Sequence, residues 1–279
     1  MTSRPIVRPA STRALTTVLG FWAVYLALVV GARIVPPVLP ARVVQLAWAV
    51  VIGAALFLLT RALVRREGRT LGEVGIGLGP RTVPRFLVGA VIGFATYALN
   101  VGVVAAAVGG LRLTPAGAID WSSVALTLAT LLALSCMEEL GFRGYPLRTL
   151  VPRIGLWPAQ AVVAVAFALT HLVYGWSWNS VVFGVLPSAF LFGAAALASG
   201  GLAMPIGLHM AVNAARWAFG ETGNAGLFTM TIDPSAAGRI ERVAPVTGIA
   251  ITLAMAAILW WWSHREGAPE VPARTSPAR

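Results

Sequence analysis

The sequence predicts an all-α protein, a polytopic transmembrane helical bundle of about eight spans. Of the 279 residues, 58% are hydrophobic and 11% are charged, whereas a soluble domain carries roughly 25% charged residues. The apolar residues form long runs, and a helix needs about 20 of them to cross a bilayer. We therefore expect a multi-pass protein of the cell membrane, with the lipid bilayer as its surroundings.

Turn residues separate the apolar runs. Pro36, Pro37 and Pro40 follow the first run, and Gly200-Gly201 divide the sixth from the seventh. The transmembrane bundle is expected over residues 15–263, between a cytoplasmic segment at 1–14 and a cytoplasmic tail at 264–279 whose composition predicts disorder. The expected spans are Leu15–Ala32, Val43–Val64, Phe86–Val108, Ser122–Arg143, Pro158–Tyr174, Ser180–Ser199, Leu202–Phe219 and Pro245–Ser263.

The basic residues indicate membrane topology rather than a nucleic-acid partner. All 21 are arginines, and they lie between the apolar runs instead of forming a basic face with interleaved aromatics. With eight spans and a cytoplasmic N-terminus, 15 arginines lie on the inner side and 6 on the outer side. The positive-inside rule therefore predicts that both termini are cytoplasmic. The six outer arginines are Arg33, Arg42, Arg112, Arg216, Arg239 and Arg242.

Two adjacent glutamates and an arginine end the fourth apolar run. A charge at membrane depth costs about 2.5–3.5 kcal/mol on insertion scales, so such a group usually has a partner and a function. Glu139 and Arg143 are spaced i and i+4, on one helix face, where they can pair. Glu138 points about 100° away. We expect Arg143 to hold Glu139 as structure and Glu138 to act as a base; the alternative is a purely structural ion cluster.

Two further apolar runs carry histidines. His171 alone would suggest a hydrogen-bonded core residue, and His209 with Asn213, again i and i+4, would suggest a bridge between helices. Polar groups on three separate spans weaken these structural explanations. A carboxylate and an imidazole can activate water, and a second imidazole with a carboxamide can stabilise an oxyanion. This set suits hydrolysis of an acyl bond, such as a peptide bond.

The same residues offer a second chemistry. Glu138, His171 and His209 can ligate zinc with an open fourth position, so the expected cofactor is either none or Zn²⁺. We expect the candidate residues to converge on one cavity that opens to the cytoplasm. A fourth span that ended at Arg143 would leave Glu138 about 10 Å nearer the cytoplasm than His171, and a helix that continues towards Pro146 would remove this offset.

Cys136 is the only cysteine, so an intrachain disulfide is excluded. A nucleophilic cysteine would need to be a thiolate, which apolar surroundings disfavour. We therefore expect Cys136 to be a small buried residue.

Three motifs together carry a family resemblance. They are Glu138-Glu139-Leu-Gly-Phe-Arg143, Phe167-x-x-x-His171 and His209-x-x-x-Asn213. In this order, on successive spans, they resemble the motifs of the type II CAAX prenyl endopeptidase family, also called the CPBP or abortive-infection intramembrane protease family. The resemblance covers roughly residues 86–219.

The resemblance implies an intramembrane endopeptidase that acts on a peptide or membrane-protein substrate. It implies that Glu138 and His171 activate water, that His209 and Asn213 stabilise the oxyanion, and that Glu139 and Arg143 support the site. The family is often labelled metalloprotease, and some of its members act in self-immunity or as scaffolds.

Two other functions are compatible with the same residues. In a proton-coupled transporter the glutamates and histidines would relay protons, but the chain has no recognisable inverted repeat of the kind typical of carriers. A non-catalytic scaffold or immunity protein could lose Glu138 or His209, whereas this chain keeps every motif position. Both alternatives are therefore less favoured than the peptidase.

Overall fold

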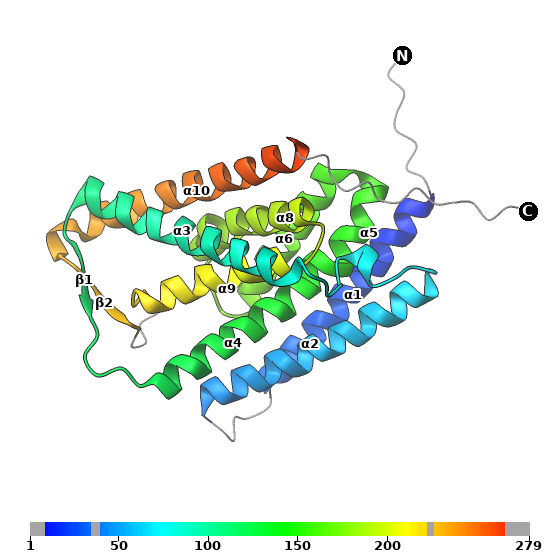
Figure 1. Cartoon of the computed structure of the whole chain (residues 1–279), viewed down its shortest axis with the longest axis horizontal. Helices are drawn as coiled ribbons and strands as arrows, with labels where there is room; N and C mark the ends of the chain where they lie inside the picture. The colour runs from blue at the N-terminus through cyan, green and yellow to red at the C-terminus, as the bar shows by residue number, and fades with distance from the viewer. Residues whose placement is uncertain (1–8, 35–39, 222–225, 266–279) are drawn as a thin grey trace, which may run out of the picture.

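The protein is a bundle of long helices with one small sheet at its end (Figure 1). The computed structural model describes residues 9–34, 40–221 and 226–265. The first half contains α1 (Pro9–Ile34), α2 (Ala41–Arg66), the short 3₁₀ turn η1 (Gly72–Val74), α3 (Thr82–Val108), β1 (Leu111–Pro115), α4 (Trp121–Glu139) and the π-helical turn η2 (Leu140–Gly144). The second half contains α5 (Tyr145–Ile154), α6 (Leu156–Val173), α7 (Trp178–Ser180), the π-helical turn η3 (Val181–Val185), α8 (Leu186–Ser199), α9 (Ala203–Ala218), β2 (Phe228–Ile232) and α10 (Pro234–Arg265).

The all-α transmembrane bundle is confirmed, and each expected span corresponds to a helical segment. Within the described residues, seven helical segments are long and apolar enough to cross a membrane. The eighth, α9, has 16 residues, hence a length of about 24 Å against a hydrocarbon core of about 30 Å. The last helix begins at Pro234 and not at Pro245, which lies inside it. Most of the expected tail, residues 266–279, lies outside the described residues.

The fourth span does not end at Arg143. Helices α4 and α5 are joined through η2 into one helical segment, Trp121–Ile154, of 34 residues. A π turn frees a backbone carbonyl from the regular ladder, and here the indole Nε1 of Trp22 on α1 donates to the carbonyl of Gly141 at 3.2 Å. The helix therefore continues past Arg143, as the alternative described above requires.

A two-stranded antiparallel sheet joins the loops at one end of the bundle, a feature that the sequence did not predict. Leu111 pairs with Ile232 at one end of the ladder, and Pro115 pairs with Phe228 at the other. The residue before α4, Asp120, accepts a hydrogen bond from the backbone N–H of Ser122 and caps that helix. Hydrogen bonds from Ser122, side chain first, together with the backbone of Ser123, lower the pKa of Asp120, which keeps the cap ionised.

Glycines bring α3 and α9 into backbone contact. An added Cβ at Gly89 would overlap the carbonyl oxygen of Met204, and one at Gly93 would overlap that of Leu208. From the other side, a Cβ at Gly207 would overlap the carbonyl oxygen of Phe86. Small residues four apart allow this close approach between membrane helices. This contact fixes the position of α9, the helix that carries His209 and Asn213.

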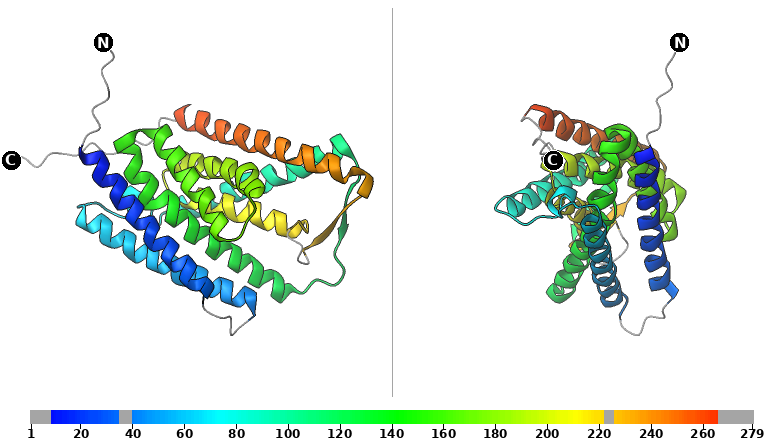
Figure 2. Two further views of the ribbon diagram at one scale, coloured as in Figure 1. Left: turned by 180° about the vertical axis from the view of Figure 1, so that it is seen from behind. Right: turned by 90° about the vertical axis from the view of Figure 1, so that its right-hand side faces the viewer.

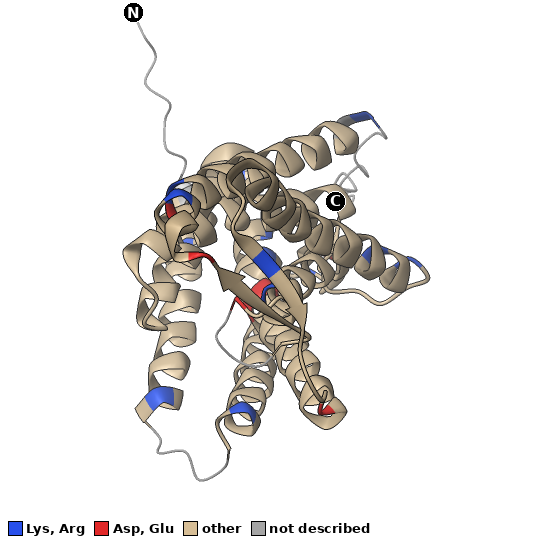
Figure 3. Ribbon diagram, turned by 90° about the vertical axis from the view of Figure 1, so that its left-hand side faces the viewer, with Lys and Arg blue, Asp and Glu red and all other residues tan. Residues whose placement is uncertain are grey.

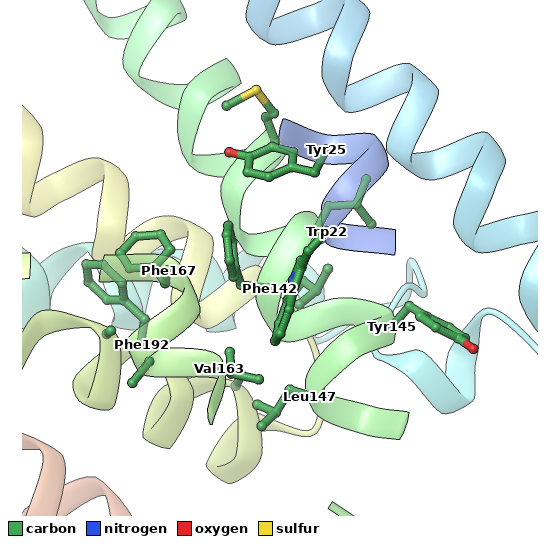
Figure 4. Packing of buried hydrophobic residues seen from close by; sticks show 14 of the residues in the cluster. Trp22, Tyr25, Phe142, Tyr145, Leu147, Val163, Phe167 and Phe192 are labelled. Atoms are coloured by element: carbon green, nitrogen blue, oxygen red, sulfur yellow. The ribbon is translucent and has the colours of Figure 1, made fainter. Parts of the chain in front are cut away.

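An aromatic cluster fills the core beside η2 (Figure 4). Phe142 is fully buried, stacks on Trp22 with ring centroids 5.9 Å apart, and meets Tyr25 and Phe167 edge-on at 5.4 and 5.1 Å. Such pairs add about 0.5–1.5 kcal/mol each beyond the burial of area. The cluster anchors α1 and α6 to the helical segment that carries the glutamates.

The start of α1 and the end of α10 lie at the end of the bundle away from the strands (Figures 1 and 2). Most of the ribbon seen from the strand end is neither acidic nor basic (Figure 3). Arg143 is fully buried in the middle of a span and marks neither side of the membrane. Without Arg143, the count made from the sequence becomes 14 arginines expected on the inner side and 6 on the outer side.

Candidate active site

Glu138 lies near the middle of the helical segment Trp121–Ile154. It stands 17 residues after the start and 16 before the end, or about 25 Å from either. Its side chain is largely buried and lines a cavity of about 1280 Å³. A carboxylate at this depth, beside a space for solvent, has the position expected of a group with a function.

Glu139 points away from the cavity into the protein. Its side chain is fully buried, and its Oε1 accepts from Arg143 Nη1 at 3.2 Å and from His209 Nδ1 at 2.9 Å. The predicted pair between Glu139 and Arg143 is thus confirmed. His209 is a second partner that the sequence did not predict.

Arg143 is held on three sides. Besides Glu139, its Nη2 donates to the carbonyl of Ala189 on α8 at 3.0 Å, and its guanidinium lies 4.2 Å from the centroid of the Phe167 ring. A cation over an aromatic face is stabilised further when it is desolvated. Arg143 therefore ties α4, α6 and α8 together beneath the cavity.

His171 on α6 has one nitrogen committed to the backbone. Its Nδ1 lies 2.9 Å from the carbonyl oxygen of Phe167, four residues earlier. A carbonyl oxygen only accepts, so Nδ1 carries the hydrogen, and the neutral ring keeps its lone pair on Nε2. The ring lines the same cavity as Glu138.

His209 lies between the two glutamates. Its Nδ1 is bonded to Glu139, and its Nε2 lies 3.6 Å from Oε2 of Glu138, too far for a hydrogen bond but within ion-pair range. The ring stacks on Phe192 with centroids 4.3 Å apart and planes 17° apart. Carboxylate and aromatic contacts together fix the orientation of this imidazole.

The four candidate residues converge on one cavity. Asn213, one turn after His209 on α9, lines it with Glu138, His171 and His209. The continuation of α4 into α5 removes the offset between Glu138 and His171 that a shorter span would have produced.

The cavity opens at the strand end of the bundle, opposite the start of α1 and the end of α10. Residues from the helix ends on that side line it, including Arg33, Arg42, Trp176, Glu221 and Arg242. The sequence predicted a cavity open to the cytoplasm together with cytoplasmic termini. The two expectations are incompatible, because the mouth lies at the opposite end of the bundle from the start of α1 and the end of α10.

Two tyrosines complete the surroundings of Glu138, and sequence reasoning missed both. Tyr174 lines the same cavity as Glu138, and the hydroxyls of Tyr174 and Tyr25 lie 2.6 Å apart. Either hydroxyl of this pair can donate to the other. The position of Tyr174, three residues after His171, offered a signal, whereas Tyr25 lies far away in the chain on α1.

The set Glu138, His171 and His209 is not arranged as a metal site. Among residues 9–34, 40–221 and 226–265, no group of three His, Cys, Asp or Glu side chains has an arrangement that could hold a metal ion. The residues present here do not fit zinc in this conformation, and we derive no chemical step through a metal.

Cys136 is exposed on the surface of α4, so the expectation of a buried residue is wrong. It does not belong to the lining of the cavity. Its neighbours Ser135 and Met137 face the interior instead, as the 100° step between successive helical residues requires. The geometry leaves Cys136 with no part in the site.

The fold and this cluster define a class of protein: a multi-pass membrane protein with carboxylates and imidazoles from three helices gathered at an internal cavity. Residues 120–215 match the family model of type II CAAX prenyl endopeptidase Rce1-like proteins. The matched segment runs from the cap of α4 to α9 and contains all six residues of the site predicted from the sequence. This match is to the same family as the resemblance carried by the motifs, and it confirms that resemblance over residues 120–215.

The family implies a membrane-embedded peptidase with a peptide substrate. Comparison with curated proteins and with solved structures gave no match.

Proposed function

We propose that the protein is an intramembrane endopeptidase that hydrolyses a peptide bond with water activated by Glu138 and His171. The observation that carries the proposal is the difference in surroundings between the two adjacent glutamates. Glu139 is fully buried and bonded to Arg143 and His209, whereas Glu138 lines the cavity.

Glu138 and His171 supply two acceptors at the cavity. The bond from Nδ1 of His171 to the Phe167 carbonyl leaves Nε2 as an acceptor in the neutral ring. Tyr174 lines the cavity together with these two residues. Water held between these groups gives one proton to Glu138 as its oxygen attacks the carbonyl carbon. Glu138 passes this proton to the departing amine as the C–N bond breaks, so the products are a carboxylic acid and an amine. General-base action of this kind contributes about 10²–10⁴-fold to the rate.

His209 and Asn213 supply donors for the oxyanion. A protonated His209 donates Nδ1–H to Glu139 and presents Nε2–H to the cavity. The carboxamide of Asn213 has two further N–H donors and lies one turn along α9. Loss of one such donor costs about 10²–10³-fold in kcat.

Glu139 and Arg143 hold this arrangement in place. Glu139 fixes the ring of His209, and Arg143 fixes Glu139 while it binds the backbone of α8. Both side chains are fully buried, and neither lines the cavity. Their function in the proposal is positional.

The 14 to 6 distribution of arginines supports cytoplasmic termini by the positive-inside rule. The mouth of the cavity would then face the outer side of the membrane, and substrates would be peptides or membrane-protein segments presented from that side.

The testing experiment measures cleavage of a peptide library by purified protein in detergent, with Glu138→Gln compared with the wild type. Glu241→Gln is the matched control, because Glu241 lines the mouth of the same cavity on α10 and is exposed. Loss of cleavage in Glu138→Gln alone, unaffected by a chelator, is the expected result.

Other outcomes of that experiment contradict the proposal. Cleavage abolished by the chelator and restored by Zn²⁺ would refute the metal-free route. Activity retained by Glu138→Gln would remove the glutamate from the mechanism. A well-folded wild type that cleaves no peptide would favour a scaffold or a carrier.

A further inference from the structure

Trp176 contacts the proposed base His171, although the mechanism proposed for the site does not use it. It follows Gly175, whose φ of +87° reverses the chain at the end of α6. The backbone N–H of Trp176 donates to the carbonyl of His171 at 3.0 Å, the bond that defines a Schellman motif. This cap folds Trp176 back over the last turn of the helix. Its ring meets the His171 ring edge-on, with centroids 5.0 Å apart and planes 84° apart.

The same cap ends α9. Gly220 has a φ of +81°, and the N–H of Glu221 donates to the carbonyl of Arg216 at 3.0 Å. Here the cap brings a carboxylate over a guanidinium, because Oε1 of Glu221 accepts from Nη2 and Nε of Arg216 at 2.8 and 3.2 Å. The other oxygen, Oε2, accepts from the hydroxyl of Tyr97 on α3. Both oxygens of Glu221 are thus engaged, which fixes the orientation of Arg216.

Arg216 joins the two caps. Its guanidinium carbon lies 5.5 Å from the centroid of the Trp176 ring, within the range of a cation–π contact. The Trp176 residue is 38% exposed and lines the cavity with Arg216 and Glu221, so burial alone does not hold it. A continuous series of contacts therefore runs from Glu221 through Arg216 and Trp176 to His171.

We propose that Trp176 is a positioning residue for His171, and that the Arg216–Glu221 pair holds Trp176 in place. This inference rests on the proposed function, in which His171 helps to activate water. The contact of Nδ1 with the Phe167 carbonyl fixes one point of the imidazole and leaves the ring free to tilt about it. Phe167 and Tyr174 contact the same ring from α6 and its cap, whereas Trp176 is the neighbour that α9 holds through Arg216. The tryptophan therefore limits the tilt and keeps Nε2 directed at the water.

The first test observes His171 without any turnover. The chain has three histidines, so ¹³C-labelled histidine gives three ring signals in detergent, which single His→Gln variants assign. Arg216→Gln leaves every aromatic ring in the chain and is expected to shift or broaden the His171 signal. Glu221→Gln keeps the cation but weakens its hold and should have the same effect to a smaller extent. Arg242→Gln is the matched control, because Arg242 also lines the cavity but lies on α10, and it should leave the signal unchanged.

The kinetics of peptide cleavage supply the second readout. Trp176→Leu is expected to lower kcat by about 10- to 100-fold, as a misplaced catalytic group does, and to leave KM unchanged. Trp176→Phe keeps an aromatic edge and should recover most of kcat, while Arg216→Gln should lower kcat by a smaller factor than Trp176→Leu. Trp178→Leu is the matched control, since Trp178 begins α7, is exposed and does not belong to the lining of the cavity.

Three results overturn the inference. They are an unchanged His171 signal in both Arg216→Gln and Glu221→Gln, a loss in Trp176→Leu that appears in KM alone, or an equal loss of kcat in Trp178→Leu. A loss in KM alone would make Trp176 a contact of the substrate. An unchanged signal in an active enzyme refutes the positional role and leaves the peptidase intact. A shifted signal in a well-folded protein that cleaves no peptide refutes the peptidase and supports the series of contacts.

Discussion

Replacing Arg143 by Met tests whether the buried ion pair holds the site together. Removal of one member of a buried pair costs about 3–5 kcal/mol, because the other charge is left uncompensated. Two features act in opposite directions here. Glu139 keeps His209 as a partner at 2.9 Å, which lessens the loss, while the carbonyl of Ala189 loses its donor, which adds about 1–3 kcal/mol.

The expected loss for Arg143→Met is therefore about 3–5 kcal/mol in the free energy of unfolding. At about 2–4 °C per kcal/mol for a chain of this size, the midpoint of thermal unfolding in detergent should fall by about 6–20 °C. Intrinsic tryptophan fluorescence is a suitable probe, because Trp22 stacks on Phe142 beside the pair.

The control is the double variant Glu139→Gln with Arg143→Met, which removes both charges and should recover at least about 1 kcal/mol of the loss. Arg143→Lys keeps a charge but loses the forked geometry and should lie between Met and the wild type. A single Arg143→Met variant within 1 kcal/mol of the wild type, or a double variant less stable than the single, would refute the reasoning.

The remaining predictions concern the support of the site and its orientation. Tyr174→Phe should lower kcat/KM about tenfold by removing a hydroxyl from the cavity that Glu138 lines, with a smaller effect for Tyr25→Phe, which is not in the lining; an equal loss in both, or none in Tyr174→Phe, would contradict a contribution of the Tyr174 hydroxyl to the site. Gly93→Leu should separate α3 from α9 and abolish cleavage, with Gly102→Leu on the open side of α3 as the control; near-normal activity in Gly93→Leu argues against a fixed α9. Reporter tags should place both termini in the cytoplasm and the β1–β2 end outside, and the reverse labelling would put the mouth of the cavity in the cytoplasm.

The sequence predicted the helical bundle well, because each membrane span is a continuous run of apolar residues that can be recognised without knowledge of its tertiary contacts. Even the i, i+4 pair Glu139–Arg143 follows from helix geometry alone. The end of the fourth span could not be predicted from local sequence. A charged residue such as Arg143 usually marks the end of a membrane span, but here contacts with α6 and α8 stabilise it in a buried position.

The sequence predicted that the four candidate residues would converge on one cavity, but it did not predict the contacts among them. Motif spacing selected His209, yet its bonds to Glu139 and its approach to Glu138 depend on how α9 packs against α4. Tyr25 has no local signal at all, since its hydroxyl meets that of Tyr174, 149 residues away in the chain. The Gly89-x-x-x-Gly93 spacing was a readable signal for the contact between α3 and α9 that positions the histidine.

The π turn at Leu140–Gly144 has a consequence for the phase of the long fourth helix. One extra residue in a turn rotates all that follows by about 100° relative to a continuous α-helix. A helical wheel drawn through Trp121–Ile154 therefore superimposes two patterns that are out of phase, one for α4 against α2 and α9 and one for α5 against α1 and α6. The π turn thus fixes the rotation of α5 about the helix axis relative to α4. Deleting one residue of the turn would remove this rotation, and either the glutamates or α5 would then point away from their partners.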